Sequence, residues 1–291
     1  MAYEDPLAYV LGLEGVALLR AFAGEYDREF VDARVAELRR ILSDYAPTGM
    51  DVEHVDTVAG YGIWSETYDN PGNPAFDFDE EIIRTVAGAL PPGVALDAAC
   101  GTGRVAAMLV DFGHRVIGVD SSADMLVHAR NRLEKATFRL GELRTLPVEN
   151  DEVDLVVCSL ALTHVPDLAP VFDEFARVLR PGGHLVIADV HPEQVARSRV
   201  PTIRLPNGAA GRVRSYCHRT GDYVRAAVAA GFAIRRCDEP VASSPPPAPT
   251  TDPGPWDAWP WSLESLVPEA AQAANASIPS MILWHLELLD R

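Results

Sequence analysis

The stretch Leu96–Arg104 reads LDAACGTGR: an apolar run ends in an acid, and small residues follow around two glycines. A glycine-rich turn after a strand commonly cradles a phosphate, because small residues let backbone N–H groups approach the ligand closely. The acid, Asp97, would repel a phosphate at the mouth of such a turn. We therefore expect a ligand that carries positive charge at this place.

Apolar runs and amphipathic segments alternate on both sides of this stretch. Five short runs are apolar on both faces, which is typical of parallel strands covered by helices: Val94–Ala98, Arg115–Asp120, Thr137–Leu140, Val153–Ser159 and His184–Asp189. Helices are expected at 80–90, 104–112, 123–134, 168–179, 223–230 and 262–274. The alternation predicts a doubly wound, Rossmann-like α/β sheet, with further strands at 233–238 and 280–289.

The flanking segments carry different patterns. Residues 1–60 are predicted to be helical, and one face of a helix is expected to carry Val31, Val35, Leu38, Leu42 and Tyr45. Residues 61–78 are aromatic and rich in turn formers, whereas 243–261 hold seven prolines and are expected to form a surface excursion. We expect residues 1–78 to form a helical lid with an aromatic loop, and 79–291 to form the sheet domain.

The composition argues against several classes of partner. The chain of 291 residues has 42 acidic and 25 basic side chains and a net charge of −17, so nucleic acid and anionic membrane surfaces are not expected partners. No apolar segment approaches the length of a membrane span, and the acidic N-terminus does not resemble a secretory signal. The four cysteines lack metal-ligand spacing, so we expect no metal site and a reducing, cytoplasmic location. Lysine occurs once, and this strong bias toward arginine favours a bacterial source.

Asp120 ends the second predicted strand. An acid at this position commonly accepts hydrogen bonds from two ribose hydroxyl groups.

Two cofactors are consistent with these residues. Residues 101–106 fit the G-x-G-x-x-A pattern of nicotinamide dinucleotide sites, but Asp97 would repel the pyrophosphate. S-adenosylmethionine has a ribose but no phosphate, and its sulfonium and ammonium groups are cationic, which suits Asp97.

Four stretches resemble, in order and spacing, the motifs of class I S-adenosylmethionine-dependent methyltransferases: LDAACGTGR, VIGVDSSADML, GELRTLPVENDEVDLVVCSLALTHV and VLRPGGHLVIADVHP. The resemblance is to the small-molecule branch similar to the ubiquinone and menaquinone methyltransferases (methyltransferase type 11), strong over 60–192 and looser over 220–289. It implies a seven-stranded sheet with an antiparallel last strand. It also implies transfer of a methyl group to an oxygen, nitrogen or carbon atom of a small organic molecule, the activity class EC 2.1.1.

The resemblance further implies roles for individual residues. Asp97 and the turn after it would hold the methionine end of the cofactor, Asp120 the ribose and Glu142 the adenine. The full set of implied cofactor-binding residues is Tyr68, Asp97, Ala98, Gly101, Gly103, Asp120, Ser121, Met125, Glu142, Leu143, Ser159 and Leu160. Two residues depart from the family pattern: Ala99 stands where a glycine is usual, and Glu142 where an aspartate is usual. Because neither departure removes a charge, cofactor binding is expected to survive.

The sequence gives fewer indications of the residues that bind the methyl acceptor. The candidate substrate-binding residues are Tyr61, Trp64, His164 and His191. A histidine titrates near neutrality and suits a general base, so we expect His191 first and His164 second in that role. The partner is expected to be a small molecule, for example a bacterial natural product, and the protein a monomer or homodimer. Two alternatives stay open: an NAD(P)-dependent oxidoreductase, and a family member that binds the cofactor without transferring methyl.

Overall fold

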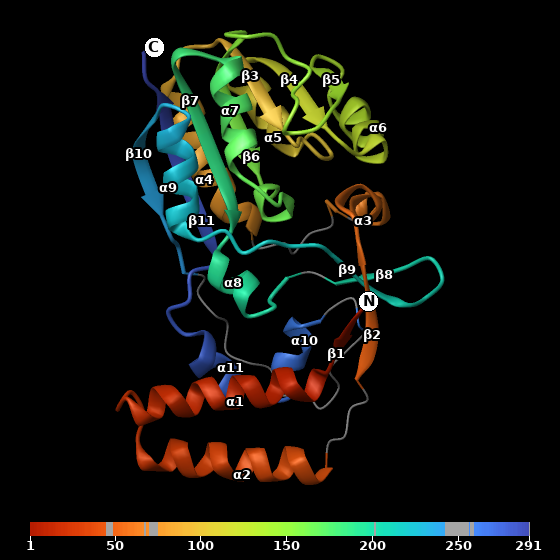
Figure 1. The fold of residues 1–291 in the computed structure, drawn as a ribbon, viewed down its shortest axis with the longest axis vertical. Coiled ribbons are helices and arrows are strands. Elements are labelled where there is room, and N and C mark those ends of the chain that lie inside the picture. The colour runs from red at the N-terminus through yellow and green to blue at the C-terminus, as the bar shows by residue number, and fades with distance from the viewer. Residues whose placement is uncertain are drawn as a thin grey trace. The chain divides into compact units, whose positions relative to one another are not determined.

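The computed structural model describes residues 1–44, 49–66, 68–69, 75–200, 202–241, 256 and 259–290. The chain forms two compact units (Figure 1). Unit 1 comprises Met1–Val55, Arg197–Arg214 and Ala242–Ile278, and unit 2 comprises Asp56–Ala196, Ser215–Val241 and Pro279–Arg291. The predicted division into 1–78 and 79–291 does not coincide with these units, because unit 1 takes up two segments from the second half of the chain. Most of the proline-rich stretch 243–261 lies outside the described residues.

Unit 2 is built on a seven-stranded sheet in the order β10–β11–β7–β6–β3–β4–β5. Its strands are β3 (Val94–Ala98), β4 (Arg115–Asp120), β5 (Thr137–Leu140), β6 (Val153–Ser159), β7 (Leu179–Val190), β10 (Phe232–Asp238) and β11 (Met281–Leu288). β11 runs antiparallel to both of its neighbours, and the other pairs are parallel. The predicted Rossmann-like sheet with an antiparallel last strand is therefore confirmed. β7 begins earlier than expected, because Leu179 already pairs with Val153.

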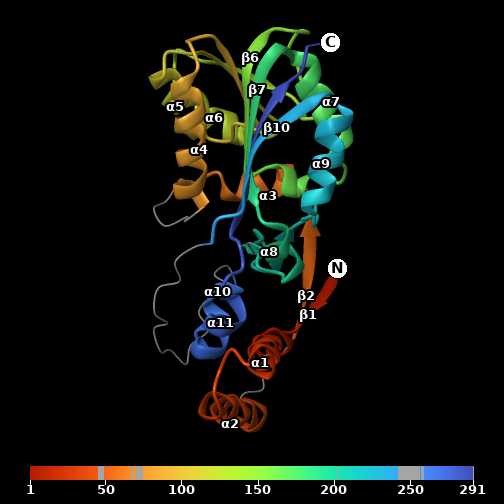
Figure 2. The ribbon, with the colours of Figure 1, turned by 90° about the vertical axis from the view of Figure 1, so that its left-hand side faces the viewer.

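Helices cover both faces of this sheet, as Figure 2 shows with the sheet seen nearly edge-on. α4 (Ala75–Ala89), α5 (Arg104–Asp111) and α6 (Ala123–Arg132) lie on one face, and α7 (Ala169–Val178) and α9 (Thr220–Ala229) lie on the other. Shorter helices of unit 2 are α3 (Thr57–Trp64), η1 (Leu162–His164) and α8 (Pro192–Ala196). Two apolar clusters result, one with Ile83 of α4 and one with Phe172 of α7. Burial on both faces explains why the strands are continuously apolar.

Unit 1 combines a small sheet with helices. The four-stranded sheet has the order β1–β2–β9–β8, formed by β1 (Ala2–Glu4), β2 (Met50–Val55), β9 (Ala210–Val213) and β8 (Thr202–Arg204). The helices are α1 (Pro6–Phe22), α2 (Arg28–Asp44), α10 (Trp261–Glu264) and α11 (Pro268–Asn275). The expectation that residues 1–60 are all helical is therefore wrong for β1 and β2. β2 pairs with β9, far along the chain, and no local pattern reveals that partner.

The buried face of helix α2 is rotated from the expected one, which it overlaps at the half-buried Val31, Val35 and Leu38. Leu42 is 63% exposed, whereas Arg34 and Ile41 are buried. Arg34 is buried because it pairs with Glu14 of α1 at 3.2 Å and with Glu269 of α11 at 2.5 Å. The helices of unit 1 thus meet around a charged group as well as around apolar side chains.

Two further differences concern the helices. Tyr45, the last residue of the predicted α2 face, lies outside the described residues. The helix predicted at 262–274 is divided into α10 and α11, because Pro268 stands at the first position of a new helix. Within the described ranges, no helix has the length and apolar character needed to cross a bilayer.

Candidate active site

Several acids and a serine lie along one edge of the sheet of unit 2. β3, β4, β6 and β7 run parallel, so their carboxyl ends share that edge. Asp97 lies next to the end of β3, Asp120 ends β4, Ser159 ends β6, and Asp189 lies next to the end of β7. Open α/β sheets bind their ligands outside this edge. The structure therefore brings together three of the predicted cofactor-binding residues: Asp97, Asp120 and Ser159.

The turn after β3 is tight and partly strained. Ala99, Gly101 and Gly103 all have left-handed backbone conformations, with φ of +63°, +50° and +79°. A Cβ atom on Gly103 would lie 3.2 Å from the backbone of Ala129 in α6, so only glycine lets the turn pack there. Among the residues that the structure describes, a Cβ atom on Gly101 would meet nothing within 4 Å. Gly101 thus faces open space, where a ligand can approach the backbone.

Ala99 occupies the position at which the related family usually has glycine, and its left-handed φ accounts for that preference. An alanine in this conformation costs about 1–2 kcal/mol, part of which is offset by the lower entropy of its unfolded state. The Ala99→Gly substitution is expected to stabilise the protein by about 1 kcal/mol, or roughly 2 °C in the unfolding midpoint. Calorimetry measures this shift, and Ala107→Gly inside α5 is the control with the opposite expected sign. If both variants lower the midpoint, Ala99 is not strained.

Asp120 is held beside the open side of the turn. Its Oδ2 accepts a hydrogen bond from the Gly101 backbone N–H at 2.8 Å, and its Oδ1 accepts one from Ser122 at 2.8 Å. Burial raises the pKa of Asp120, although backbone hydrogen bonds from Ser122, Gly101 and Ser121 lower it. Met125 is fully buried one turn into α6. The Asp120 carboxylate is thus oriented by the loop that the sequence predicts to bind the cofactor.

Asp97 is 1% exposed, and burial raises the pKa of its carboxyl group to about 7. A hydrogen bond from the Ala106 backbone and the charge of Arg104 lower that pKa, but less than burial raises it. Within the part of the chain that the structure describes, the buried Oδ2 atom of Asp97 has no hydrogen-bond partner. An unpartnered buried carboxylate oxygen is costly unless a cation or donor meets it. The site therefore fits a ligand ammonium group.

An aromatic cluster gathers on Tyr61 of α3. The Tyr61 ring packs edge-on against Trp64 and His164, with ring centroids 5.1 and 5.5 Å apart, and lies 5.9 Å from the Tyr68 ring. Its hydroxyl group donates a hydrogen bond to the Leu160 carbonyl oxygen at 3.2 Å. Leu160 follows β6 directly and has a φ of +54°, a strained conformation for so bulky a residue. Five predicted site residues therefore lie together beyond the end of β6.

The segment before α4 is attached to the turn after β3. Asp69 accepts a hydrogen bond from the Thr102 hydroxyl group at 2.9 Å and pairs with Arg132 of α6 at 2.6 Å. Tyr68 precedes Asp69 directly, and its ring lies 5.8 Å from the Phe76 ring. These contacts hold Tyr68 between the turn and the aromatic cluster.

His191 has a different setting from His164. Its ring is 5% exposed, its Nδ1 accepts a hydrogen bond from the Glu193 backbone at 3.2 Å, and its Nε2 lies 3.2 Å from Glu239. Both ring nitrogens are thus engaged at the start of α8. The structure places His164, and not His191, against the aromatic cluster.

Glu142 and Leu143 follow β5. The Glu142 side chain is 68% exposed and lies 3.7 Å from Arg144. Leu143 packs partly buried against the apolar cluster on the α7 face. The adenine-binding role of these two residues therefore remains a prediction.

Asp79 and Arg104 belong to this site but were not among the residues predicted from the sequence. Asp79 of α4 pairs with both terminal nitrogens of Arg104, and it accepts a hydrogen bond from the Ser159 hydroxyl group. A signal for Asp79 was present, because it has helical spacing to Ile82 and Ile83 and so lies on the apolar face of α4. An acid on the buried face of a helix requires a cationic or donor partner.

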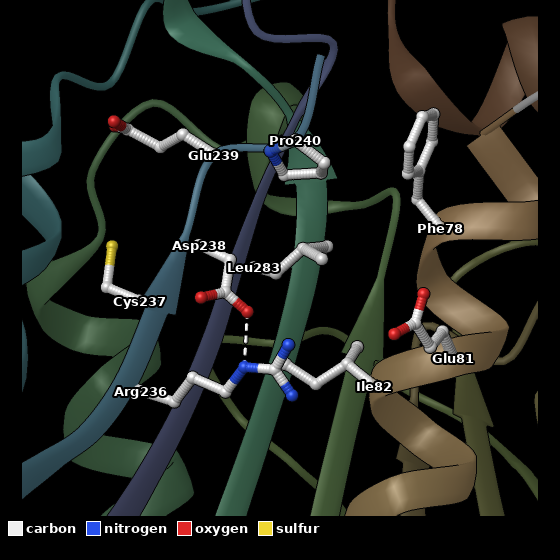
Figure 3. Close-up of a pocket in the computed structure, with 9 residues that line it drawn as sticks. All are labelled: Phe78, Glu81, Ile82, Arg236, Cys237, Asp238, Glu239, Pro240 and Leu283. Atoms are coloured by element: carbon white, nitrogen blue, oxygen red, sulfur yellow. Dashed lines mark hydrogen bonds and ion pairs between the residues drawn. The ribbon is translucent and has the colours of Figure 1, made fainter. Parts of the chain in front are cut away.

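A cavity of about 460 Å³ lies between α4 and the strands β10 and β11 (Figure 3). Ile82 and Leu283 supply apolar walls, and Arg236 forms an ion pair with Asp238 along the wall made by β10. Partial burial and the neighbouring acids raise the pKa of the Cys237 thiol to about 11. A thiol with this pKa is not ionised at neutral pH, so the cavity offers no thiolate nucleophile.

Comparisons with known proteins agree with this geometry. Residues 96–187 match a family model described as a methyltransferase domain. An uncharacterized methyltransferase of Emericella nidulans is 29% identical over 227 residues, which cover 64% of this chain and 79% of that protein. An arsenite methyltransferase of Halobacterium salinarum is 31% identical over 191 residues, which cover 57% of this chain and 48% of that protein. The other curated relatives are matched over about half of their own length or less.

Solved structures share the fold. DhpI in its complex with S-adenosylhomocysteine (SAH) superimposes with a TM-score of 0.55 at 20% identity, over 80% of this chain and 96% of that one. The cyclase SpnF superimposes with a TM-score of 0.54 at 17% identity, over 83% of this chain and 100% of that one. The comparisons decide between the two cofactors that the residues alone left open. Sequence and fold point the same way: residues 96–187 are similar to methyltransferase domains, and the chain shares the fold of methyltransferases that use S-adenosylmethionine.

Proposed function

We propose that the protein transfers the methyl group of S-adenosylmethionine to an oxygen, nitrogen or carbon atom of a small organic molecule. The observation that carries this proposal is the aromatic cluster on Tyr61, which is bonded to Leu160 at the end of β6. It lies next to the edge that carries Asp97 and Asp120. Aromatic walls with one or two polar groups are typical of sites for small organic ligands.

The residues around the turn after β3 divide the recognition of the cofactor among them. Asp97 would meet the ammonium group of the methionine end, since its Oδ2 is buried and unpartnered within the described residues. Gly101 and Gly103 let the backbone approach that end closely. Asp120, already aligned by Gly101 and Ser122, would accept hydrogen bonds from the ribose hydroxyl groups.

When bound, S-adenosylmethionine supplies an electrophilic methyl group. The protein has to align an acceptor with that group and exclude water. Tyr61, Trp64 and Tyr68 are suited to both tasks, because their rings contact one another and form a wall. An oxygen acceptor must also lose a proton, and the contact of His164 with Tyr61 in the aromatic cluster supports His164 as the base that would accept it.

The test is incubation of the purified protein with S-adenosylmethionine labelled in its methyl group and with fractionated small-molecule extracts. Label in an extract molecule supports the proposal. The fold alone does not establish transfer, because the cyclase SpnF shares it. Tight cofactor binding without labelled product in any fraction would favour a member of the fold that does not transfer methyl.

Asp120→Ala is expected to weaken the binding of SAH about tenfold, because two ribose hydroxyl groups lose a charged acceptor. Adenosine contains the same ribose, so its affinity should fall by a similar factor. Isothermal titration calorimetry measures both, with Asp173→Ala on the exposed side of α7 as a control. Unchanged affinity for either ligand would show that the ribose assignment is wrong.

A further inference from the structure

Asp79 connects three elements of unit 2. It lies on α4 and is 0% exposed. Its Oδ1 accepts a hydrogen bond from one terminal nitrogen of Arg104 at 3.1 Å, and its Oδ2 accepts one from the other. The same Oδ2 also accepts a hydrogen bond from the hydroxyl group of Ser159. Asp79 thus joins α4 to the first residue of α5 and to the last residue of β6.

The surroundings fix the geometry of this group. Burial raises the pKa of Asp79, and hydrogen bonds from Arg104 and Ser159 lower it, so the charged form depends on both partners. The Arg104 guanidinium also stacks on the Phe76 ring, with its central carbon 4.0 Å from the ring centroid. A guanidinium held by a two-point contact and a ring has little freedom to turn. The carboxylate of Asp79 is therefore held in one orientation.

This orientation decides what Ser159 can offer to a ligand. A hydroxyl group has one hydrogen and two lone pairs. Because the Ser159 hydrogen is donated to Asp79, the oxygen atom has only lone pairs left for any other neighbour. Ser159 ends β6, the neighbour of β3 in the sheet, so it lies at the edge where Asp97 and Asp120 would hold the two parts of the cofactor that flank its sulfonium. A cationic group next to this oxygen would meet the negative end of the hydroxyl dipole.

We propose that Asp79 is a positioning residue that fixes Ser159 as a hydrogen-bond acceptor and thereby makes the site prefer the cationic sulfonium of S-adenosylmethionine to the neutral thioether of SAH. The inference rests on the proposed function of the site. It gives the protein a means of releasing the product in exchange for fresh methyl donor, because the two ligands differ only in the methyl group and the charge.

The experiment compares dissociation constants for S-adenosylmethionine and SAH. In Asp79→Asn, the amide oxygen is expected to face the donors of Arg104, which leaves the amide N–H to donate to Ser159. The Ser159 hydrogen is then free to point toward the cofactor. We expect the preference for S-adenosylmethionine over SAH to fall about fivefold in this variant and in Ser159→Ala.

The controls separate a positioning role from a structural one. Ser159→Thr retains a hydroxyl group and should keep the wild-type preference. Glu80→Gln alters the acid next to Asp79, which is partly exposed and 3.6 Å from Arg104, and should also keep it. Equal losses of both ligands in Asp79→Asn and Ser159→Ala would mean that the group merely holds the fold, and would overturn the proposal. If Asp79→Asn does not fold, Ser159→Ala alone decides.

The binding measurements also distinguish a wrong cofactor site from a wrong role for Asp79. If the wild-type protein binds neither ligand, the cofactor site itself is wrong and the role of Asp79 is rejected with it. If the wild-type protein binds both ligands and the variants keep its preference, only the role of Asp79 is rejected.

Discussion

At pH 8, the Asp97→Asn variant is expected to bind S-adenosylmethionine and SAH about 100-fold more weakly than the wild type. The amide keeps the size of the side chain but removes the charge that would meet the ligand ammonium group. A hydrogen bond between charged groups in a buried site contributes roughly 1.5–3 kcal/mol, which corresponds to about 10- to 150-fold in affinity. Asp97, at 1% exposure, lies toward the upper end of that range.

The pH dependence of cofactor affinity provides a separate test of the role of Asp97. Burial raises the pKa of Asp97 to about 7, so below pH 7 the free protein holds a proton on this carboxyl group. A cationic ligand favours the ionised form, so binding releases that proton. Affinity should therefore rise up to about tenfold per pH unit as the pH approaches 7 from below, and should level off above about pH 8.

Calorimetry in buffers of different ionisation enthalpy detects the released proton directly. At pH 6 the wild type should release close to one proton on binding SAH, and Asp97→Asn none. Adenosine lacks the amino-acid end, so its affinity should be nearly equal in both proteins. Asp111→Asn, at the exposed end of α5, is the control for the loss of one negative charge. A strong loss of adenosine affinity in Asp97→Asn would show that the variant disturbs the turn instead.

Replacing His164 with alanine is expected to lower kcat about 100-fold for an oxygen acceptor, a scale typical of the loss of a general base. The reason is its position, because the ring packs against Tyr61 in the aromatic cluster. The affinity for SAH should change less than twofold, since His164 is not among the residues proposed to hold the cofactor. Single-turnover kinetics with labelled donor separate the two quantities.

His191→Ala is the matched comparison. The sequence favoured His191 as base, but its ring nitrogens are engaged by Glu193 and Glu239. We expect this variant to lower the unfolding midpoint more than kcat. If His191→Ala loses activity at unchanged stability while His164→Ala remains active, the order proposed from the sequence was right.

The sheet of unit 2 could be predicted because its signals are local. Val94–Ala98, Arg115–Asp120 and Val153–Ser159 are apolar runs with a polar residue at or next to the end, and the structure has the same bounds. The small sheet of unit 1 could not be predicted in this way. Its strands are short and carry polar residues, and the pairing of Met50–Val55 with Ala210–Val213 joins segments that are distant in sequence.

The residues of the candidate site likewise include some that the sequence could predict and some that it could not. Asp97 and Asp120 stand at strand ends inside recognisable motifs, so their position at one edge followed from the sequence. Asp79 belongs to a helix before the first strand of the sheet, and only the fold brings it to Ser159. His191 and His164 each follow a strand end, and the sequence could not tell which of them has its ring occupied.

The strand order has a consequence for how the chain is completed during synthesis. β11 is synthesised after β7 and β10 but lies between them in the sheet, and unit 1 needs residues up to Ile278. Neither unit can close until these late segments have been made, and contacts between distant segments form slowly. Until then, the edges of β7 and β10 are unpaired and open to association with other chains. Protection of those two edges is therefore expected to favour folding over aggregation until β11 is inserted.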